Sequence, residues 1–197
     1  MQRHFLLTGL VIIFAILALI AISLDRSIER PSSQSAMMIK VKFNLLNQNS
    51  QPINEVSFRG KHTLIFFGYT YCPDICPTVL HNISESLYLL DKHLKKIQPI
   101  FITIDPERDT PKVIKSYLGN FHPLITGLTG KPEQVKKVAK AFGVYFAKAE
   151  KDKNLEEDYL VDHSGGIYFM GGDGRFITKF SHSSTPEEIA RNIKKYL

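Results

Sequence analysis

The sequence predicts an α/β fold, in which helices flank a central mixed sheet, preceded by an N-terminal transmembrane helix. Two continuous apolar runs, at residues 63–67 and 100–104, have the length and composition of strands that are buried on both faces. Each run is followed by a segment with apolar residues three and four positions apart, which is the period of an amphipathic helix. A third apolar run, at residues 5–24, carries no charge and is long enough to cross a bilayer as a helix.

The composition limits the classes to which the chain can belong. Its 197 residues are 44% hydrophobic and 22% charged, so we expect one folded domain with an appendage and no global disorder. Two cysteines are too few for a disulfide-rich scaffold or for a four-thiolate zinc site. The formal net charge is +6, but the lysines fall on predicted helix faces without interleaved aromatic residues, so no nucleic-acid partner is expected.

The N-terminal region divides by composition. We expect residues 1–4 to be a short cytoplasmic N-terminus, 5–24 a transmembrane signal-anchor, 25–39 a polar tether, and 40–197 the folded domain. A cleaved signal peptide is the alternative, but its apolar core is usually about 7–15 residues long and is followed by a small-x-small site. The apolar run here is longer and ends in AISLDR, without such a site.

The charges that flank the apolar run do not by themselves decide its orientation in the membrane. Arg3 on one side of the apolar run is balanced by Arg26 and Arg30 on the other, and these two are partly offset by acidic neighbours. The short N-terminal flank is typical of a signal-anchor that keeps its amino end inside and exports the rest. Because no Arg-rich, Ser-rich amphipathic leader precedes it, the sequence favours a bacterial inner membrane, with the domain in the periplasm.

The first half of the domain contains strands and helices in alternation. Apolar residues from Leu80 to Leu94 keep a 3.6-residue period, and Pro77 suits a first helical turn. The expected elements are strands at 40–46, 56–58 and 63–67, a helix at 77–94, a strand at 100–104 and a helix at 111–118.

The second half ends in short strands and a last helix. The sequence GGDG predicts a hairpin turn, and Thr185 followed by Pro186 predicts a capped helix start. The expected elements are strands at 125–128 and 144–147, a helix at 132–142, a charged insertion at 148–158, strands at 159–163, 167–170 and 175–180, and the final helix. This order, with both cysteines between a core strand and a helix, predicts a thioredoxin-like fold.

The chemistry is concentrated in YTYCPDICPTVL, which contains Cys72 and Cys76. Two thiols at the start of a helix can face the same side, and the helix N-terminus favours the thiolate form. Such a pair can form a short-loop disulfide or hold a soft metal ion such as Cu(I). A disulfide that only stabilises the fold is the alternative interpretation of the spacing.

His163, in YLVDHSGG, is a third candidate ligand, because the two glycines after it let the backbone approach another loop. Two thiolates and an imidazole form a three-coordinate set suited to Cu(I). Asp162 could orient His163 or contact a partner, and Asp74 could modulate the thiolate pKa or docking; each is otherwise a solvated loop acid. The remaining histidines are interpreted as surface or core residues, with His81 as the one alternate ligand.

The stretches FFGYTYCPDICPTVL, FITIDPERDTP, HPLITGLTG and YLVDHSGGIYFM together resemble the SCO/SenC family of membrane-anchored copper proteins, which assist assembly of cytochrome c oxidase. The likeness extends from about residue 43 to the C-terminus. It implies a thioredoxin fold and one copper, as Cu(I), Cu(II) or both, bound by Cys72, Cys76 and His163. The DPERDTP stretch is expected to be structural, and the methionines at 37, 38 and 170 are assigned to the tether and the core.

The resemblance leaves two functions open. One is a metallochaperone, not an enzyme, that passes copper to the dinuclear centre of cytochrome c oxidase subunit II or its assembly intermediates. The other is a thiol-disulfide reductase that keeps the acceptor's cysteines reduced. Only the first strictly needs His163, because disulfide exchange requires two thiols and no imidazole. Further partners would be an upstream copper donor or a thiol reductant; a peroxidase is a distant third interpretation, because P-x-x-x-T-x-x-C does not precede Cys72.

Overall fold

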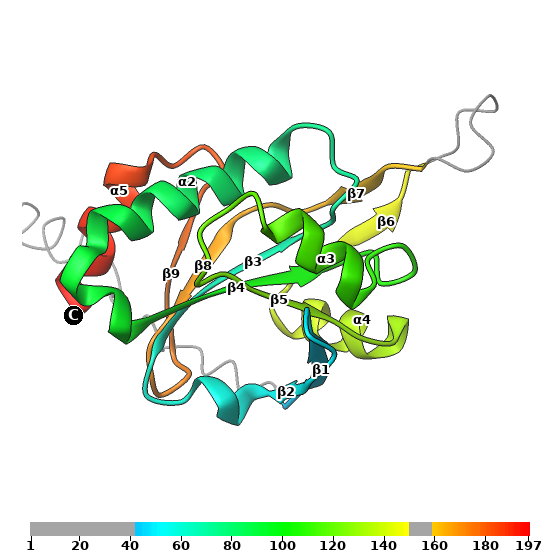
Figure 1. The fold of residues 1–197 in the computed structure, drawn as a ribbon, viewed down its shortest axis with the longest axis horizontal. Helices are drawn as coiled ribbons and strands as arrows, with labels where there is room; N and C mark the ends of the chain where they lie inside the picture. The colour runs from blue at the N-terminus through cyan, green and yellow to red at the C-terminus, as the bar shows by residue number, and fades with distance from the viewer. Residues whose placement is uncertain (1–41, 150–158) are drawn as a thin grey trace, which may run out of the picture. The chain divides into compact units, whose positions relative to one another are not determined.

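A seven-stranded mixed sheet, in the order β2-β1-β5-β4-β3-β8-β9, forms the centre of the structure (Figure 1). The computed structural model describes residues 42–149 and 159–197. The three middle strands β5, β4 and β3 are parallel, and β1 and β8 flank them antiparallel. The predicted α/β fold with a mixed sheet is therefore confirmed. The strands of this sheet are β1 (Asn44–Asn47), β2 (Pro52–Asn54), β3 (His62–Gly68), β4 (Ile97–Thr103), β5 (Thr126–Thr129), β8 (Ile167–Met170) and β9 (Phe176–Phe180).

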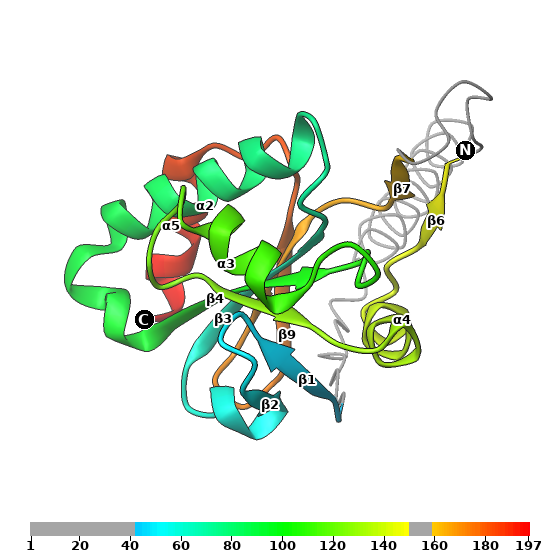
Figure 2. The same ribbon diagram turned by 45° about the vertical axis from the view of Figure 1, so that its right-hand side comes forward.

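Helices cover both faces of the sheet. Figure 2 shows α2 (Ile75–Leu90), α3 (Pro111–Leu118) and α5 (Pro186–Ile193) on one side and α4 (Pro132–Ala141) on the other. The side chains follow this division, because neighbouring residues of a strand point to opposite faces. Phe101 of β4 packs against Tyr117 of α3, whereas Phe67 of β3 packs against Phe142 at the end of α4. The apolar runs predicted at β3 and β4 are thus buried on both faces.

The predicted strand at 56–58 is wrong. These residues belong to a 3-10 helix, η1 (Glu55–Phe58), and a short strand, β2, that the sequence did not predict precedes it. Asn54 explains the difference, because its side chain accepts the backbone N–H of Val56 and so caps the helix. The alternation of Val56 and Phe58 is typical of a strand, and it carries no information about the capping hydrogen bond from Asn54.

The helix after the cysteines begins at Ile75, two residues before the predicted Pro77, so that Cys76 lies inside its first turn. It ends at Leu90, and Leu94 belongs to a separate 3-10 helix, η2 (Asp91–Lys96). The last helix begins as predicted, with the Thr185 hydroxyl accepting the backbone N–H of Glu188. A 3-10 turn, η3 (Lys194–Tyr196), ends the chain.

Two strands, β6 (Phe146–Lys148) and β7 (Val161–His163), form a separate antiparallel pair. They correspond to the predicted strands at 144–147 and 159–163, with shifted bounds. The hairpin of β8 and β9 around GGDG is confirmed.

Several predictions fall outside the described residues: the transmembrane helix at 5–24, the tether, the first residues of the strand predicted at 40–46, and most of the insertion. Within residues 42–149 and 159–197, no helix has the length and apolar character needed to span a membrane.

Candidate metal centre

The cysteine loop connects β3 to α2. The buried strand ends at Gly68, and a six-residue loop leads to the helix start at Ile75. Cys72 is half-buried in this loop and Cys76 is fully buried in the first turn of α2, and both are free thiols. The backbone N–H of Cys76 donates a hydrogen bond to Cys72 Sγ at 3.4 Å. The Asp74 side chain makes no capping bond, so the sulfur of Cys72 satisfies this N–H at the helix terminus instead.

The two thiols have opposite acidities. The hydrogen bond donated by Cys76 lowers the pKa of Cys72 to about 5, and backbone N–H groups of Cys76 and Asp74 act in the same direction. The pKa of Cys76 is raised, because its proton is held in the hydrogen bond to Cys72 and because the side chain is buried. At neutral pH the pair therefore holds one proton, with a thiolate at Cys72 and a thiol at Cys76.

His163 reaches the same place from β7. Its Nε2 lies 3.9 Å from Cys76 Sγ, and its ring stands edge-on to Tyr69 with 6.2 Å between the ring centroids. The other ring nitrogen, Nδ1, lies 3.3 Å from the carbonyl oxygen of Ser164. If Nδ1 carries the proton and donates it there, Nε2 presents a lone pair to the thiols; this tautomer is inferred from the contact.

Two connections bring His163 to the cysteines across 87 positions of sequence. The backbone N–H of Val161 donates to the Tyr69 hydroxyl at 3.2 Å, which joins β7 to the residue after β3. Beyond His163, the chain enters β8, which pairs with β3 at Ile167 and Phe66. These connections bring His163 beside the cysteine loop that follows β3.

Cys76 contacts both of the other residues: its backbone N–H donates to Cys72 Sγ at 3.4 Å, and its own Sγ lies 3.9 Å from His163 Nε2. Within the described part of the chain, no group of three or more His, Cys, Asp and Glu side chains stands ready to hold a metal ion. The donor types nevertheless fit a soft ion, because two sulfurs and an imidazole are the ligands that Cu(I) prefers. Binding of such an ion by Cys72, Cys76 and His163 stays a prediction.

The two carboxylates named by the sequence analysis lie at the surface. Asp162 is exposed on β7, where strand alternation turns it to the face opposite His163. The His163 imidazole contacts the Ser164 carbonyl instead, so the contacts give no support to an orienting role for Asp162. Asp74 is exposed at the start of α2, and its carbonyl oxygen accepts the Thr78 hydroxyl. Docking roles for both carboxylates stay predictions.

Asp109 is a residue of this site that sequence reasoning missed. It is completely buried after β4, where its carboxylate accepts the Thr70 backbone N–H at 3.0 Å and the Thr103 hydroxyl at 2.6 Å. Burial raises the pKa of Asp109, although the hydrogen bonds from both threonines oppose the shift. The DPERDT segment is thus structural, as predicted, but its role is specific: it ties the cysteine loop to the neighbouring strand.

Arg108 was also missed. Its guanidinium pairs with the buried Asp105 and lies against the rings of Tyr159 at 3.6 Å and Tyr71 at 4.6 Å. The hydroxyl of Tyr159 donates to the same Asp105 carboxylate at 2.7 Å. One signal was available, because the carboxyl ends of adjacent parallel strands meet at one sheet edge, so DPERDT had to lie beside YTYC.

Gly68 is a third residue of the candidate metal centre that the sequence analysis did not name. A Cβ at this position would lie 2.8 Å from Cys76 Sγ and 3.0 Å from the Phe66 ring. A residue larger than glycine would therefore displace the buried thiol.

Comparison with known sequences places these features in a wider group. Residues 31–197 match the family model described as SCO1/SenC. The SCO2-like protein of Rickettsia felis is 43% identical over 152 residues, which make up 77% of this chain and 74% of that protein. The mitochondrial protein SCO2 of Saccharomyces cerevisiae is 43% identical over 160 residues, 79% of this chain and 53% of that protein.

Solved structures give the same result. The copper-bound structure of ScoI from Bradyrhizobium japonicum has a TM-score of 0.74 and 46% identity, covering 80% of this chain and 98% of that one. Copper-bound yeast Sco1 has a TM-score of 0.72 and 36% identity, covering 79% and 86%. A lipoprotein from Bacillus anthracis, described as SCO1/SenC, has a TM-score of 0.68 and 25% identity, covering 79% and 92%. The predicted thioredoxin-like fold is the fold of these proteins.

Proposed function

This chain belongs to the SCO1/SenC family, and from that premise we propose that it is a copper metallochaperone. It binds one copper through Cys72, Cys76 and His163 and delivers it to the dinuclear copper centre of cytochrome c oxidase subunit II. Copper is its cargo, so the transfer is an exchange of ligands without net catalysis. The observation that carries the proposal is the position of His163 Nε2, 3.9 Å from Cys76 Sγ, while the backbone N–H of Cys76 donates to Cys72 Sγ.

The acidities indicate the order of events when copper binds. The Cys72 thiolate is available at neutral pH and is the first sulfur to bind, because its pKa is lowered to about 5. Cys76 binds only with loss of its proton, so loading the site releases about one proton per copper. His163 adds a neutral nitrogen donor when its proton sits on Nδ1, beside the Ser164 carbonyl.

A copper titration of the reduced, full-length chain in detergent without oxygen tests this assignment. We expect about one copper per chain, and we expect His163→Ala to weaken binding by roughly 10–100-fold. His81→Ala is the matched control, because His81 is exposed on α2 and should leave the affinity unchanged. Unaltered affinity in His163→Ala would refute the three-residue site, and a loss in His81→Ala would indicate the alternate ligand.

A second function, thiol-disulfide reduction of the acceptor, is favoured by the unequal pair of thiols. A half-buried thiolate at Cys72 can attack a disulfide, and the buried Cys76 can resolve the mixed disulfide. Because this exchange does not use an imidazole, His163→Ala should retain it while losing copper affinity. Both activities can coexist on the same two sulfurs.

The proposal includes a membrane location. Residues 5–24 anchor the chain in a bacterial inner membrane, after a short cytoplasmic N-terminus at 1–4, and residues 25–39 tether a periplasmic domain at 40–197. The relative from Bacillus anthracis is described as a lipoprotein, which supports attachment of the domain to a membrane. A reporter fused after residue 197 that is active only in the periplasm should be active; an inactive fusion would reverse the orientation.

A further inference from the structure

The hydroxyl group of Tyr117, on α3, is buried and has no hydrogen-bond partner among the residues that the structure describes. The side chain as a whole is half-buried, so part of the ring reaches the surface while its hydroxyl end points into the domain. A buried hydroxyl without a partner lowers stability, because it has given up its hydrogen bonds to water. Such a group in a folded protein calls for an explanation.

The Tyr117 ring packs into an aromatic cluster beside the candidate metal centre. Its centroid lies 6.1 Å from that of Phe101 and 5.3 Å from that of Phe121. The Phe101 ring in turn borders Gly68, where a Cβ would meet Phe101 Cε2 at 3.1 Å and Cys76 Sγ at 2.8 Å. Phe101 therefore adjoins both Tyr117 and the buried thiol of Cys76.

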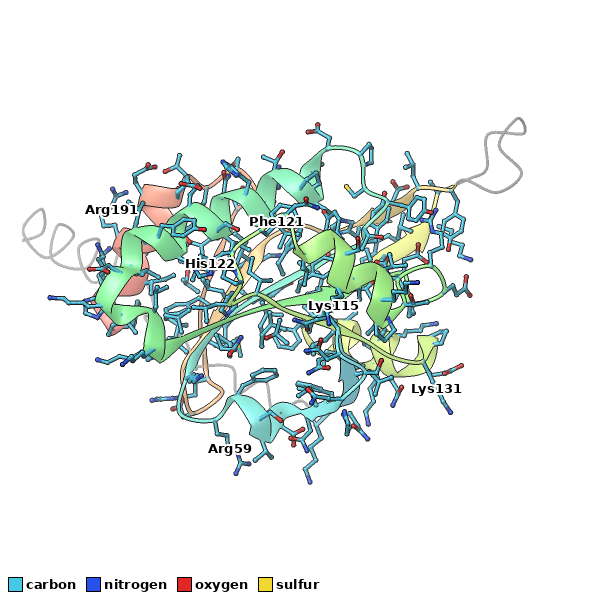
Figure 3. All side chains as sticks on the ribbon, viewed as in Figure 1. Arg59, Lys115, Phe121, His122, Lys131 and Arg191 are labelled. Carbon is cyan, nitrogen blue, oxygen red and sulfur yellow. The ribbon has the colours of Figure 1, made fainter. Side chains whose placement is uncertain are left out.

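The backbone around Tyr117 is held from two sides. Shortly after α3, the backbone N–H of His122 donates to the hydroxyl of Ser84 on α2 at 3.0 Å, and Figure 3 shows Phe121 and His122 in this segment next to α2. On the side of the sheet, apolar residues of α3 pack so closely on β5 that a Cβ at Gly127 would collide with them. The hydroxyl proton can still turn about its C–O bond without moving the ring.

The negative groups within electrostatic range of the Tyr117 hydroxyl belong to the candidate metal centre. Burial raises the pKa of Tyr117, and negative charge on nearby groups raises it further. These groups are, in order of their effect, Cys76, Cys72 and Asp109. The phenol therefore keeps its proton at neutral pH, so it is an unpaired hydrogen-bond donor within electrostatic range of the Cys76 sulfur.

The sulfur of Cys76 becomes a suitable acceptor when it binds a metal. The side chain is fully buried, and the neighbours that border Gly68 with it are the apolar rings of Phe66 and Phe101. The sulfur of a thiol is a weak hydrogen-bond acceptor. A sulfur that binds a metal does so as a thiolate, and a buried anion is stabilised by a hydrogen bond donated to it.

We propose that the Tyr117 hydroxyl donates a hydrogen bond to the Cys76 sulfur when this sulfur binds copper. As the copper–sulfur bond forms, the Cys76 proton leaves to solvent and Tyr117 keeps its own proton. Tyr117 is therefore a positioning residue, which holds a ligand and does not touch the metal. The inference rests on the proposed copper function and deepens it: the same hydroxyl destabilises the empty protein and stabilises the loaded one.

Tyr117→Phe removes only the hydroxyl and separates these two effects. In the reduced, full-length chain in detergent without oxygen, the variant should melt about 2–4 °C above the wild type before copper is added, because the unpaired group is gone. It should bind Cu(I) roughly 10-fold more weakly in competition with bicinchoninic acid, because the Cys76 thiolate has lost a donor. Tyr88→Phe is the matched control, since Tyr88 is exposed on α2 and should change neither quantity.

The two measurements distinguish this inference from the proposed function. A higher melting temperature with unchanged Cu(I) affinity would show that the hydroxyl stays unpaired in the loaded protein. A lower melting temperature would show that the hydroxyl is already paired in the empty protein. Either result would overturn the inference and leave the proposed copper function standing, whereas a wild type that binds no Cu(I) would overturn both.

The Cu(II)-loaded protein gives a third readout, which a purely structural effect of the substitution would not change. A hydrogen bond to a sulfur ligand lowers the energy of its electrons, so its loss should move the sulfur-to-copper charge-transfer absorption of Tyr117→Phe to longer wavelength. Tyr88→Phe should absorb at the wild-type wavelength. An absorption at that wavelength in Tyr117→Phe as well would overturn the inference.

Discussion

The buried carboxylate of Asp109, in the loop after β4, accepts the backbone N–H of Thr70, in the loop after β3, at 3.0 Å. This contact joins the cysteine loop to the neighbouring parallel strand through an acid that also accepts the hydroxyl of Thr103. Because burial raises the pKa of Asp109, its charged form costs stability even though three donors surround it.

Two replacements of Asp109 should separate the effect of its hydrogen bonds on stability from the effect of its charge. Asn keeps an oxygen for Thr70 N–H and the Thr103 hydroxyl and places its amide beside Thr70 Oγ1, so Asp109→Asn should melt at or above the wild-type temperature at pH 7. Asp109→Ala leaves these donors unpaired and should lose about 2–4 kcal/mol. Thermal melts of both variants decide this, and equal losses for Asn and Ala would contradict it.

The same residue predicts a pH dependence. A folded-state pKa above the unfolded value means that the folded chain binds the proton more tightly, so the contribution of Asp109 is greatest below the unfolded pKa of about 3.9. It declines as the pH rises through the raised folded pKa. The melting temperature of the wild type should therefore rise relative to that of Asp109→Asn as the pH is lowered from 7 toward 4. A constant difference would refute the assignment.

Alkylation should distinguish the two thiols. Cys72 should react with iodoacetamide along a pH profile with a midpoint near 5, while Cys76 stays unreactive to pH 9 in the folded chain. Cys76→Ala removes the largest cause of the lowered pKa and should move the Cys72 midpoint upward. Mass spectrometry of each cysteine peptide gives both rates. A wild-type midpoint near 8.5 would show that Cys72 is an ordinary thiol.

Arg108 should be needed for the site to hold its shape. Removing the guanidinium leaves the buried Asp105 without its ion pair and Tyr71 and Tyr159 without their shared partner. Arg108→Gln should cost about 2–4 kcal/mol, and Arg108→Lys should recover only part of this, because an ammonium does not stack as a guanidinium does. Chemical denaturation measures both. Lys148→Gln, which breaks an exposed pair with Glu107, is the control and should have little effect.

Gly68 and Gly165 provide a matched pair near the metal centre. A Cβ at Gly68 would collide with Cys76 Sγ at 2.8 Å, whereas a Cβ at Gly165 would meet its nearest neighbour, His182, at 3.5 Å. Gly68→Ala should lower stability by about 1–3 kcal/mol and weaken copper binding, and Gly165→Ala should do neither. Denaturation curves and copper titrations of the two variants test this. Equal behaviour would mean that Cys76 can shift without cost.

The strand, loop and helix around the cysteines could be predicted from the sequence. A buried strand is a continuous apolar run, and an amphipathic helix repeats its apolar residues every 3.6 positions. The thiols and His163 could be named because few residue types bind soft metals. η1 could not be predicted, since its start depends on one capping bond from Asn54. Asp109 and Arg108 also contact residues that are distant in the sequence, Thr70 and Tyr159, and these contacts form only in the folded domain.

His163 stands on the β6–β7 pair, which hydrogen-bonds internally, while the cysteines stand on the sheet-and-helix core. An ion held by all three would be a reversible cross-link between the β6–β7 pair and the core. It would join Cys76 to His163 across 87 positions of the sequence. Because such an ion binds only where all three side chains meet in the folded chain, loading it would stabilise the state in which β7 is attached to the core, and unloading it would remove that stabilisation. A partner that binds at the candidate metal centre would then meet a more rigid surface on the loaded protein than on the apo protein.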